Sequence, residues 1–213
     1  MSIHTIINCI MGMIIMLIVP IMCIRTFCEL DEDCRDKLKL NKTNIITLML
    51  VAIGYGLVTP LLIPTEFEYI NLTLLMAYLV FMSYTDQKTM LLYTAPSIVM
   101  FMVELLLLIL NYNNLSFDRY TPTVLVVLVA LYAMSLFRWI GYGDVLIYTV
   151  LIIYLMQYRA VPTMSLLINI LLTNILFVVT TLIMKIIKKD KSKHQPLTIF
   201  IAISTYLCNI FYV

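Results

Sequence analysis

The sequence contains little charge. Asp, Glu, Lys and Arg together make up 12% of its 213 residues, whereas 62% are hydrophobic and the mean hydropathy is +1.01. This composition excludes an ordinary soluble domain, in which about a quarter of the residues would be charged. The net charge is only +2, and no nucleic-acid partner is expected. We therefore expect a polytopic membrane protein whose constant partner is the lipid bilayer.

Histidine is scarce, and the cysteines are poorly spaced for metal binding. The only histidines, His4 and His194, are expected on opposite sides of the membrane, which leaves a Ser-His or Cys-His hydrolytic site poorly supported. None of the five cysteines forms a pair with the two-residue spacing of a zinc knuckle. The sequence therefore predicts no metal and no cofactor.

Long apolar runs account for almost the whole chain. A membrane-spanning helix needs about 20 apolar residues, and eight segments approach that length, although the sixth is short. We predict an all-α fold with about eight transmembrane helices and a single transmembrane domain over residues 1–213. The expected spans are 3–24, 43–62, 69–85, 91–110, 122–138, 144–158, 163–184 and 196–213.

The distribution of Lys and Arg predicts the orientation. Twelve of these residues fall in the first, third, fifth and seventh loops, and two fall in the even-numbered loops. Cytoplasmic loops carry the excess of basic residues, so the odd-numbered loops should be cytoplasmic and both termini should lie outside. The first loop, residues 25–42, is then a short cytoplasmic connection.

An acidic residue marks the predicted cytoplasmic start of the sixth span. Asp144 follows Gly141, Tyr142 and Gly143, which include two of only five glycines in the chain. An acidic side chain at a membrane helix is costly and is a functional candidate by default. Helix capping is the alternative explanation for Asp144, since Asp is a favoured N-cap residue, but it does not explain the paired glycines.

A second carboxylate, Asp86, is expected at the same face of the membrane. It is the only acidic residue near the third loop, and an ordinary loop aspartate paired with Lys88 is the alternative. Two neighbouring carboxyl groups do not ionise together easily and tend to share a proton. The ionised member can then activate a water molecule while the protonated member polarises a carbonyl group. The sequence therefore indicates an aspartyl protease with Asp86 and Asp144 as the catalytic pair.

Two further features lie within the apolar segments. Glu104 is past the middle of the fourth span, where it is either a proton or ion site or a hydrogen-bonded packed carboxyl group. The string Gly54-Tyr55-Gly56 is similar to a potassium filter, but no re-entrant pore helix precedes it. Close helix packing through small residues is the better explanation for these glycines.

The chain has an aspartate, Asp86, and later a Gly-Tyr-Gly-Asp motif, both expected at the cytoplasmic face of an eight-helix protein. In this pattern it resembles the type IV prepilin leader peptidases. These are intramembrane aspartyl proteases of the GxGD type. The resemblance extends from about residue 70 to the end of the chain. There, Gln195 to Ala202 is similar to the family's Pro-Phe-Gly-Pro-Phe-Leu-Ala stretch, with Pro196 as the retained proline. The resemblance assigns the catalytic roles to Asp86 and Asp144, with Gly141, Tyr142, Gly143, Lys88 and Pro196 as supporting residues.

The chain departs from the family pattern at several positions. Leu146 stands where the family usually has Lys, Tyr93 where it often has Pro, and Thr198 and Ile199 replace the glycine and second proline of the last stretch. Many members also carry a cytoplasmic domain with two Cys-x-x-Cys pairs, linked to N-methylation. Residues 25–42 contain no such pair. The resemblance therefore implies a short form without the methyltransferase domain.

The resemblance implies a function in the bacterial inner membrane. The substrate would be a type IV prepilin or pseudopilin, cleaved at the cytoplasmic face between a short leader and an apolar helix, for pilus assembly or protein secretion. A proton- or ion-coupled transporter using the same acids is the main alternative, although no inverted repeat supports it. Two further alternatives remain: an assembly scaffold that has lost peptidase activity, and a GxGD protease of another kind.

Overall fold

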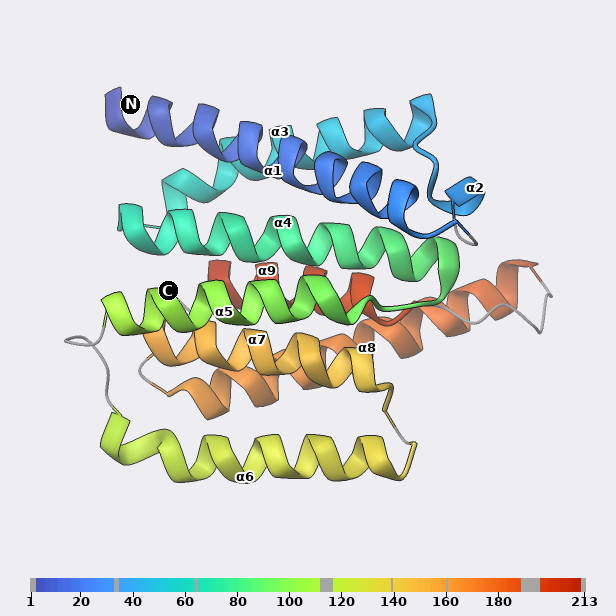
Figure 1. Ribbon diagram of the computed structural model, residues 1–213. Helices are drawn as coiled ribbons and strands as arrows, with labels where there is room; N and C mark the ends of the chain where they lie inside the picture. Colours follow the sequence, from blue (N-terminus) through green and yellow to red (C-terminus); the bar gives the residue numbers. More distant parts are fainter. Residues whose placement is uncertain are drawn as a thin grey trace.

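The computed structural model describes residues 3–32, 35–63, 65–111, 117–138, 140–159, 161–188 and 196–211, without the side chains of 117–121, 185, 187 and 188. The described residues form nine helices and no strand (Figure 1). The helices are α1 (Ile3–Leu30), α2 (Arg35–Leu38), α3 (Lys42–Leu62), α4 (Glu66–Thr89), α5 (Thr94–Leu110), α6 (Phe117–Leu136), α7 (Tyr142–Tyr158), α8 (Pro162–Lys188) and α9 (Thr198–Phe211).

The all-α prediction is confirmed, and each of the eight predicted apolar segments is helical. Four helices, α1, α3, α4 and α8, are long and apolar enough to cross a membrane, whereas α5, α7, α9 and the apolar part of α6 are shorter. The protein is therefore a multi-pass membrane protein, and the count of eight crossings stays a prediction. The start of α1 and the end of α9 lie at the same end of the bundle (Figure 1). This arrangement agrees with the expectation that both ends of the chain lie on the same side of the membrane. That this is the non-cytoplasmic side stays a prediction.

Two predicted boundaries need correction at the opposite end of the bundle. Residues 25–30 belong to α1, and residues 35–38 form a helical turn, so the expected loop at 25–42 is largely helical. Helix α4 likewise continues past residue 85 and ends at Thr89. It is followed by the C-cap residue Met90, whose φ of 56° places it in the left-handed region. Asp86 therefore belongs to the last turn of α4 rather than to a loop. We call this end of the bundle, which contains α2 and the α4–α5 connection, the carboxylate end.

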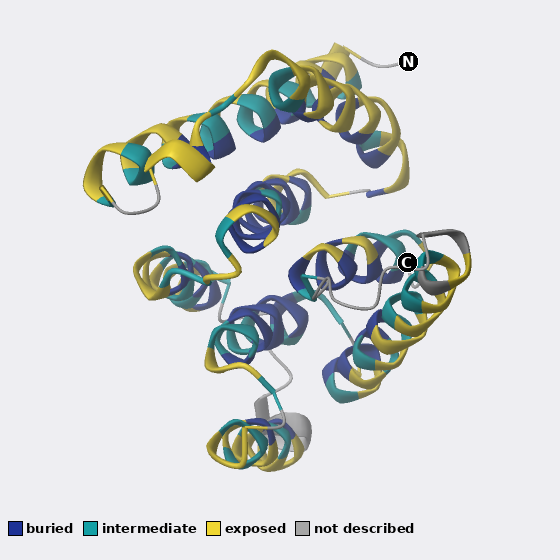
Figure 2. Ribbon diagram, turned by 90° about the vertical axis from the view of Figure 1, so that its right-hand side faces the viewer, coloured by how far each residue is buried: buried dark blue, intermediate teal, exposed yellow. Residues whose placement is uncertain are grey.

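Helices α4 and α7 form the centre of the molecule. Figure 2 shows both helices buried around most of their circumference, whereas the outer helices expose one side. Helix α4 packs against α1, α5, α7 and α9, and α7 packs against α5, α6 and α8. The exposed sides of the outer helices carry large apolar residues such as Leu50, Leu106 and Leu171, as expected for a surface that faces lipid. The two predicted catalytic carboxylates therefore belong to the two most enclosed helices.

One glycine of the Gly54-Tyr55-Gly56 string supports the packing interpretation. A Cβ atom at Gly56 would overlap the Met13 side chain and would approach the Cys9 carbonyl oxygen to 2.9 Å, so this glycine allows α3 to lie close against α1. A Cβ atom at Gly54 would meet nothing within 4 Å. Gly54 therefore faces open space.

Candidate active site

Asp86 lies in the last turn of α4, and its side chain is 8% exposed. Its Oδ2 atom accepts two hydrogen bonds from Thr198, at 2.8 Å from the hydroxyl group and 3.3 Å from the backbone N–H. Thr198 is the first residue of α9, where helix N–H groups have no intrahelical acceptor. The start of α9 therefore holds one oxygen of the Asp86 carboxyl group in place.

Asp144 lies in the first turn of α7, three residues after the N-cap Gly141. Its carboxyl group accepts a hydrogen bond from the Gly141 backbone N–H, an arrangement similar to half of a capping box. Helix capping therefore accounts for one interaction of the Asp144 carboxyl group. Its Oδ1 atom is buried and has no hydrogen-bond partner among the described residues, so the hydrogen-bonding capacity of this oxygen is unsatisfied.

The two carboxyl groups lie at the carboxylate end, close enough to interact electrostatically. The charge of Asp86 acts on the Asp144 carboxyl group, although the two residues are 58 positions apart in the chain. Helices α4 and α7 are in direct contact, which brings the end of one to the beginning of the other. Two carboxyl groups in such a position share protons as a pair. A pair of this kind has the chemistry to supply a general acid and a general base, the two groups that hydrolysis of a peptide bond requires.

Gly143 brings the α4–α5 connection against the beginning of α7. A Cβ atom at Gly143 would overlap Leu92, with the Leu92 Cδ1 atom only 2.6 Å away. Close backbone approach is therefore the reason for this glycine. Neither Gly141 nor Gly143 has a positive φ, so these glycines are not needed for a left-handed backbone conformation.

The other predicted supporting residues lie around this pair. The Lys88 side chain is exposed, and its Nζ lies 5.9 Å from the ring centroid of Tyr84. No ion pair between Lys88 and Asp86 is present among the described residues. Tyr142 is exposed and contacts the Tyr132 ring edge-on. Pro196 precedes α9 by two residues. His194, Gln195 and the lysines at 189, 191 and 193 lie outside the described residues.

Glu104 belongs to a separate polar cluster. It is fully buried, and its Oε2 atom accepts hydrogen bonds from Asn71 at 3.2 Å and from Gln157 at 2.9 Å. Asn71 precedes Asp86 by 15 residues on the same helix, which corresponds to about 22 Å along the axis. Glu104 therefore links α4, α5 and α7 far from the two aspartates, as expected for a hydrogen-bonded packed carboxyl group.

The residue that the sequence did not indicate is Thr198. We noted it only as a departure from the family pattern. A polar residue at the beginning of an apolar segment is also a common helix start, so nothing in its local sequence distinguishes it. Its contact with Asp86 joins residues 112 positions apart and depends on the packing of α9 against α4.

The chain was compared with models of known protein families, with curated proteins and with solved structures. A family model described as the type IV leader peptidase family matches residues 73–187, which is more than half of the chain. The chain belongs to this family. The matched range includes Asp86, Asp144 and the Gly141–Gly143 step, and it ends before Pro196. No curated protein and no solved structure matches the chain. Membership of the type IV leader peptidase family identifies the protein as a membrane-embedded protease.

Proposed function

We propose that this leader peptidase is an aspartyl endopeptidase of the bacterial inner membrane. It removes the leader peptide from type IV prepilins or pseudopilins at the cytoplasmic face. The observation that carries this proposal is the electrostatic interaction of Asp86, at the end of α4, with Asp144, at the beginning of α7, both within the family match. The basic residues of α2 and its flanks lie at this end, which supports a cytoplasmic position.

In the proposed reaction, the aspartate pair holds one proton and binds a water molecule. The ionised carboxylate takes a proton from the water, whose oxygen attacks the scissile carbonyl carbon while the protonated carboxyl group donates its proton to the carbonyl oxygen. The tetrahedral intermediate then collapses, the C–N bond breaks, and the leaving nitrogen receives a proton from the pair. One hydroxyl group of the intermediate returns its proton to the pair as the new carboxylic acid forms, so the pair again holds one proton. The Oδ1 atom of Asp144, whose hydrogen-bonding capacity is unsatisfied, is our candidate for the oxygen that binds the water molecule or carbonyl group once the substrate opens the site.

The hydrogen bonds from Thr198 give the two aspartates different positions. Two donors converge on Oδ2 of Asp86 and fix this carboxyl group against α9. We propose that the pair as a unit supplies the general base and the general acid. No cofactor or metal takes part in this scheme.

The first prediction is that both aspartates are required for processing. Asp86→Asn and Asp144→Asn remove the carboxyl group while keeping the size of the side chain, so each should reduce cleavage by at least about 100-fold, the lower end of the contribution of acid–base groups. Membranes containing each variant and a panel of prepilins are assayed for the mass shift of the mature pilin. Asp36→Asn, which changes an exposed aspartate of α2, is the matched control. Undiminished processing by either site variant at normal protein levels would rule out the aspartyl mechanism.

A further inference from the structure

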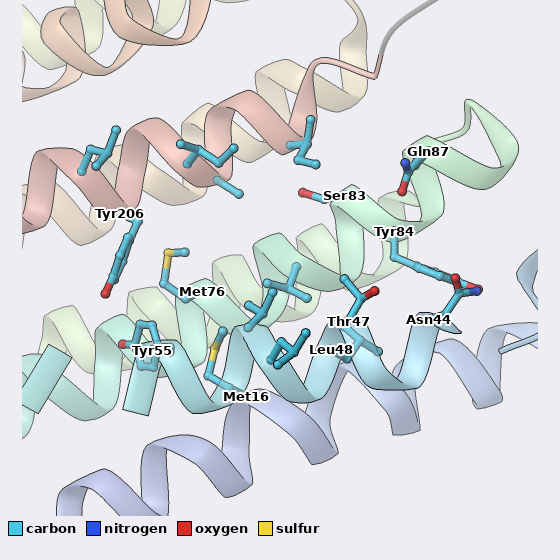
Figure 3. A pocket seen from close by; sticks show the side chains of 18 of the residues that line it. Met16, Asn44, Thr47, Leu48, Tyr55, Met76, Ser83, Tyr84, Gln87 and Tyr206 are labelled. Atoms are coloured by element: carbon cyan, nitrogen blue, oxygen red, sulfur yellow. The ribbon is translucent and has the colours of Figure 1, made fainter. Parts of the chain in front are cut away.

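An apolar groove of about 830 Å³ runs along the molecule between α3 and α9, with α4 as its floor (Figure 3). The side chains of Leu50, Val51, Val58 and Ile203 line it and are each more than 40% exposed, so the groove is open along the outer surface of the bundle. In a membrane protein, this opening faces the lipid. The groove is therefore accessible to an apolar molecule that diffuses within the bilayer.

One end of the groove adjoins Asp86. Ser83, Tyr84, Gln87 and Lys88, which surround Asp86 on α4, all line it. On α9, Ile199 lines the groove directly after Thr198, the residue that donates two hydrogen bonds to Asp86. If a molecule lies in the groove, its segment nearest the carboxylate end therefore reaches the candidate catalytic pair.

The lining changes in polarity along its length. Figure 3 shows Tyr55 and Tyr206 near one end and Asn44, Tyr84 and Gln87 near the other, with Met16, Leu48 and Met76 between them. The polar side chains of Asn44, Gln87 and Ser83 at the carboxylate end can hydrogen-bond an unwound backbone. Lys88 is the only charged residue of the described lining, so this end favours carbonyl oxygens or an acidic group and disfavours a basic side chain.

The dimensions of the groove match one face of an α-helix. From Asn44 to Val58, the α3 wall is about 21 Å long at 1.5 Å per residue. Because the groove is open along the outer surface, an apolar helix lying in it would contact the protein on one side and lipid on the other.

We propose that this groove is the docking site for the apolar transmembrane helix of the substrate. The helix lies between α3 and α9, and its end unwinds beside Asn44 and Gln87 to present a peptide bond to Asp86 and Asp144. Because the inference rests on the proposed peptidase function, its tests need one readout that depends on cleavage and one that does not.

Gly54 allows the groove to be filled without disturbing the protein. It lines the groove, and a Cβ atom there would meet nothing within 4 Å. We expect Gly54→Phe to lower kcat/KM for a full-length prepilin at least tenfold, mainly through KM. A short soluble peptide that spans the cleavage junction without the apolar helix should be cleaved as by wild type. Ile53→Phe, at a neighbouring exposed position outside the lining, is the control.

The cleavage assay has two results that would overturn the inference. One is wild-type processing of the full-length prepilin by Gly54→Phe. The other is an equal loss of activity toward both substrates, which would indicate damage to the catalytic centre. Absence of cleavage by wild type would contradict the proposed function instead, and the docking is then decided by a binding experiment.

Photo-crosslinking supplies that experiment. A benzophenone amino acid at Ile203, in the groove, should capture the full-length prepilin in the Asp144→Asn background, whereas the same group at the exposed Val126 of α6 should not. Capture of phospholipid alone at Ile203, or equal capture of prepilin at both positions, would overturn the docking site whatever the result of the cleavage assay.

Discussion

At the residue scale, the environments of the two aspartates are unequal. Asp86 receives its donors from another helix, whereas Asp144 receives its donor from the beginning of its own helix. The Asp86 geometry therefore depends on the position of α9, and that of Asp144 depends only on the local turn. Thr198 is thus a positioning residue, and it occupies a place where the family pattern has glycine, which has no side chain to donate.

This asymmetry leads to a prediction for Thr198. Thr198→Val removes the hydroxyl donor and keeps the shape, and a hydrogen bond to a charged group contributes about 1.5–3 kcal/mol. We expect kcat to fall about 10- to 100-fold with little change in KM, because the substrate does not touch this side chain. Thr198→Ser, which keeps the hydroxyl group, should restore most of the activity. Equal losses in both variants would point to packing rather than to the hydrogen bond.

At the element scale, the site is assembled where helix ends meet. The end of α4, the beginnings of α7 and α9 and the α4–α5 connection converge there. The apolar runs predicted each helix well, because the length and composition of a membrane segment are properties of the local sequence. The extension of α4 through Asp86 was missed, because polar residues after an apolar run look the same in a loop and in a last helical turn.

The contact between Gly143 and Leu92 gives a prediction at this scale. Gly143→Ala places a methyl group against Leu92, and overpacking of this kind costs about 1–3 kcal/mol. We expect a lower melting temperature in detergent and reduced processing, because the α4–α5 connection moves relative to α7. Leu92→Ala in the same chain should recover much of both losses.

Ile53→Phe, which changes an exposed residue outside the groove lining, is the control for this experiment. A Gly143→Ala protein with wild-type stability and activity would show that the close approach is dispensable. Failure of Leu92→Ala to improve the variant would show that another neighbour accounts for the loss.

At the scale of the whole molecule, the two ends of the bundle differ in their charged groups. The carboxylate end carries Arg35, Lys37, Lys39 and Lys88 beside the two aspartates, together with the acidic residues Glu29, Glu32 and Asp36. At the other end, Arg159 forms an ion pair with Glu68 at 3.3 Å, and His4 lies 3.5 Å from Glu66. The excess of basic residues at one end could be predicted from the sequence, because it depends only on which loops contain Lys and Arg and on the alternation of the loops between the two ends. The groove and the meeting of the aspartates depend on which helices pack together, and local sequence does not determine that.

The charge asymmetry predicts the orientation of the protein, which decides where cleavage occurs. In a cysteine-free background, Asp36→Cys on α2 should react with a membrane-impermeant maleimide only in inverted vesicles, because the basic end remains in the cytoplasm. His4→Cys, at the opposite end, should react only in intact spheroplasts. Activity of the cysteine-free parent is the control for folding. Labelling of Asp36→Cys from outside would place the aspartates away from the cytoplasm, where a leader retained in the cytoplasm could not reach them.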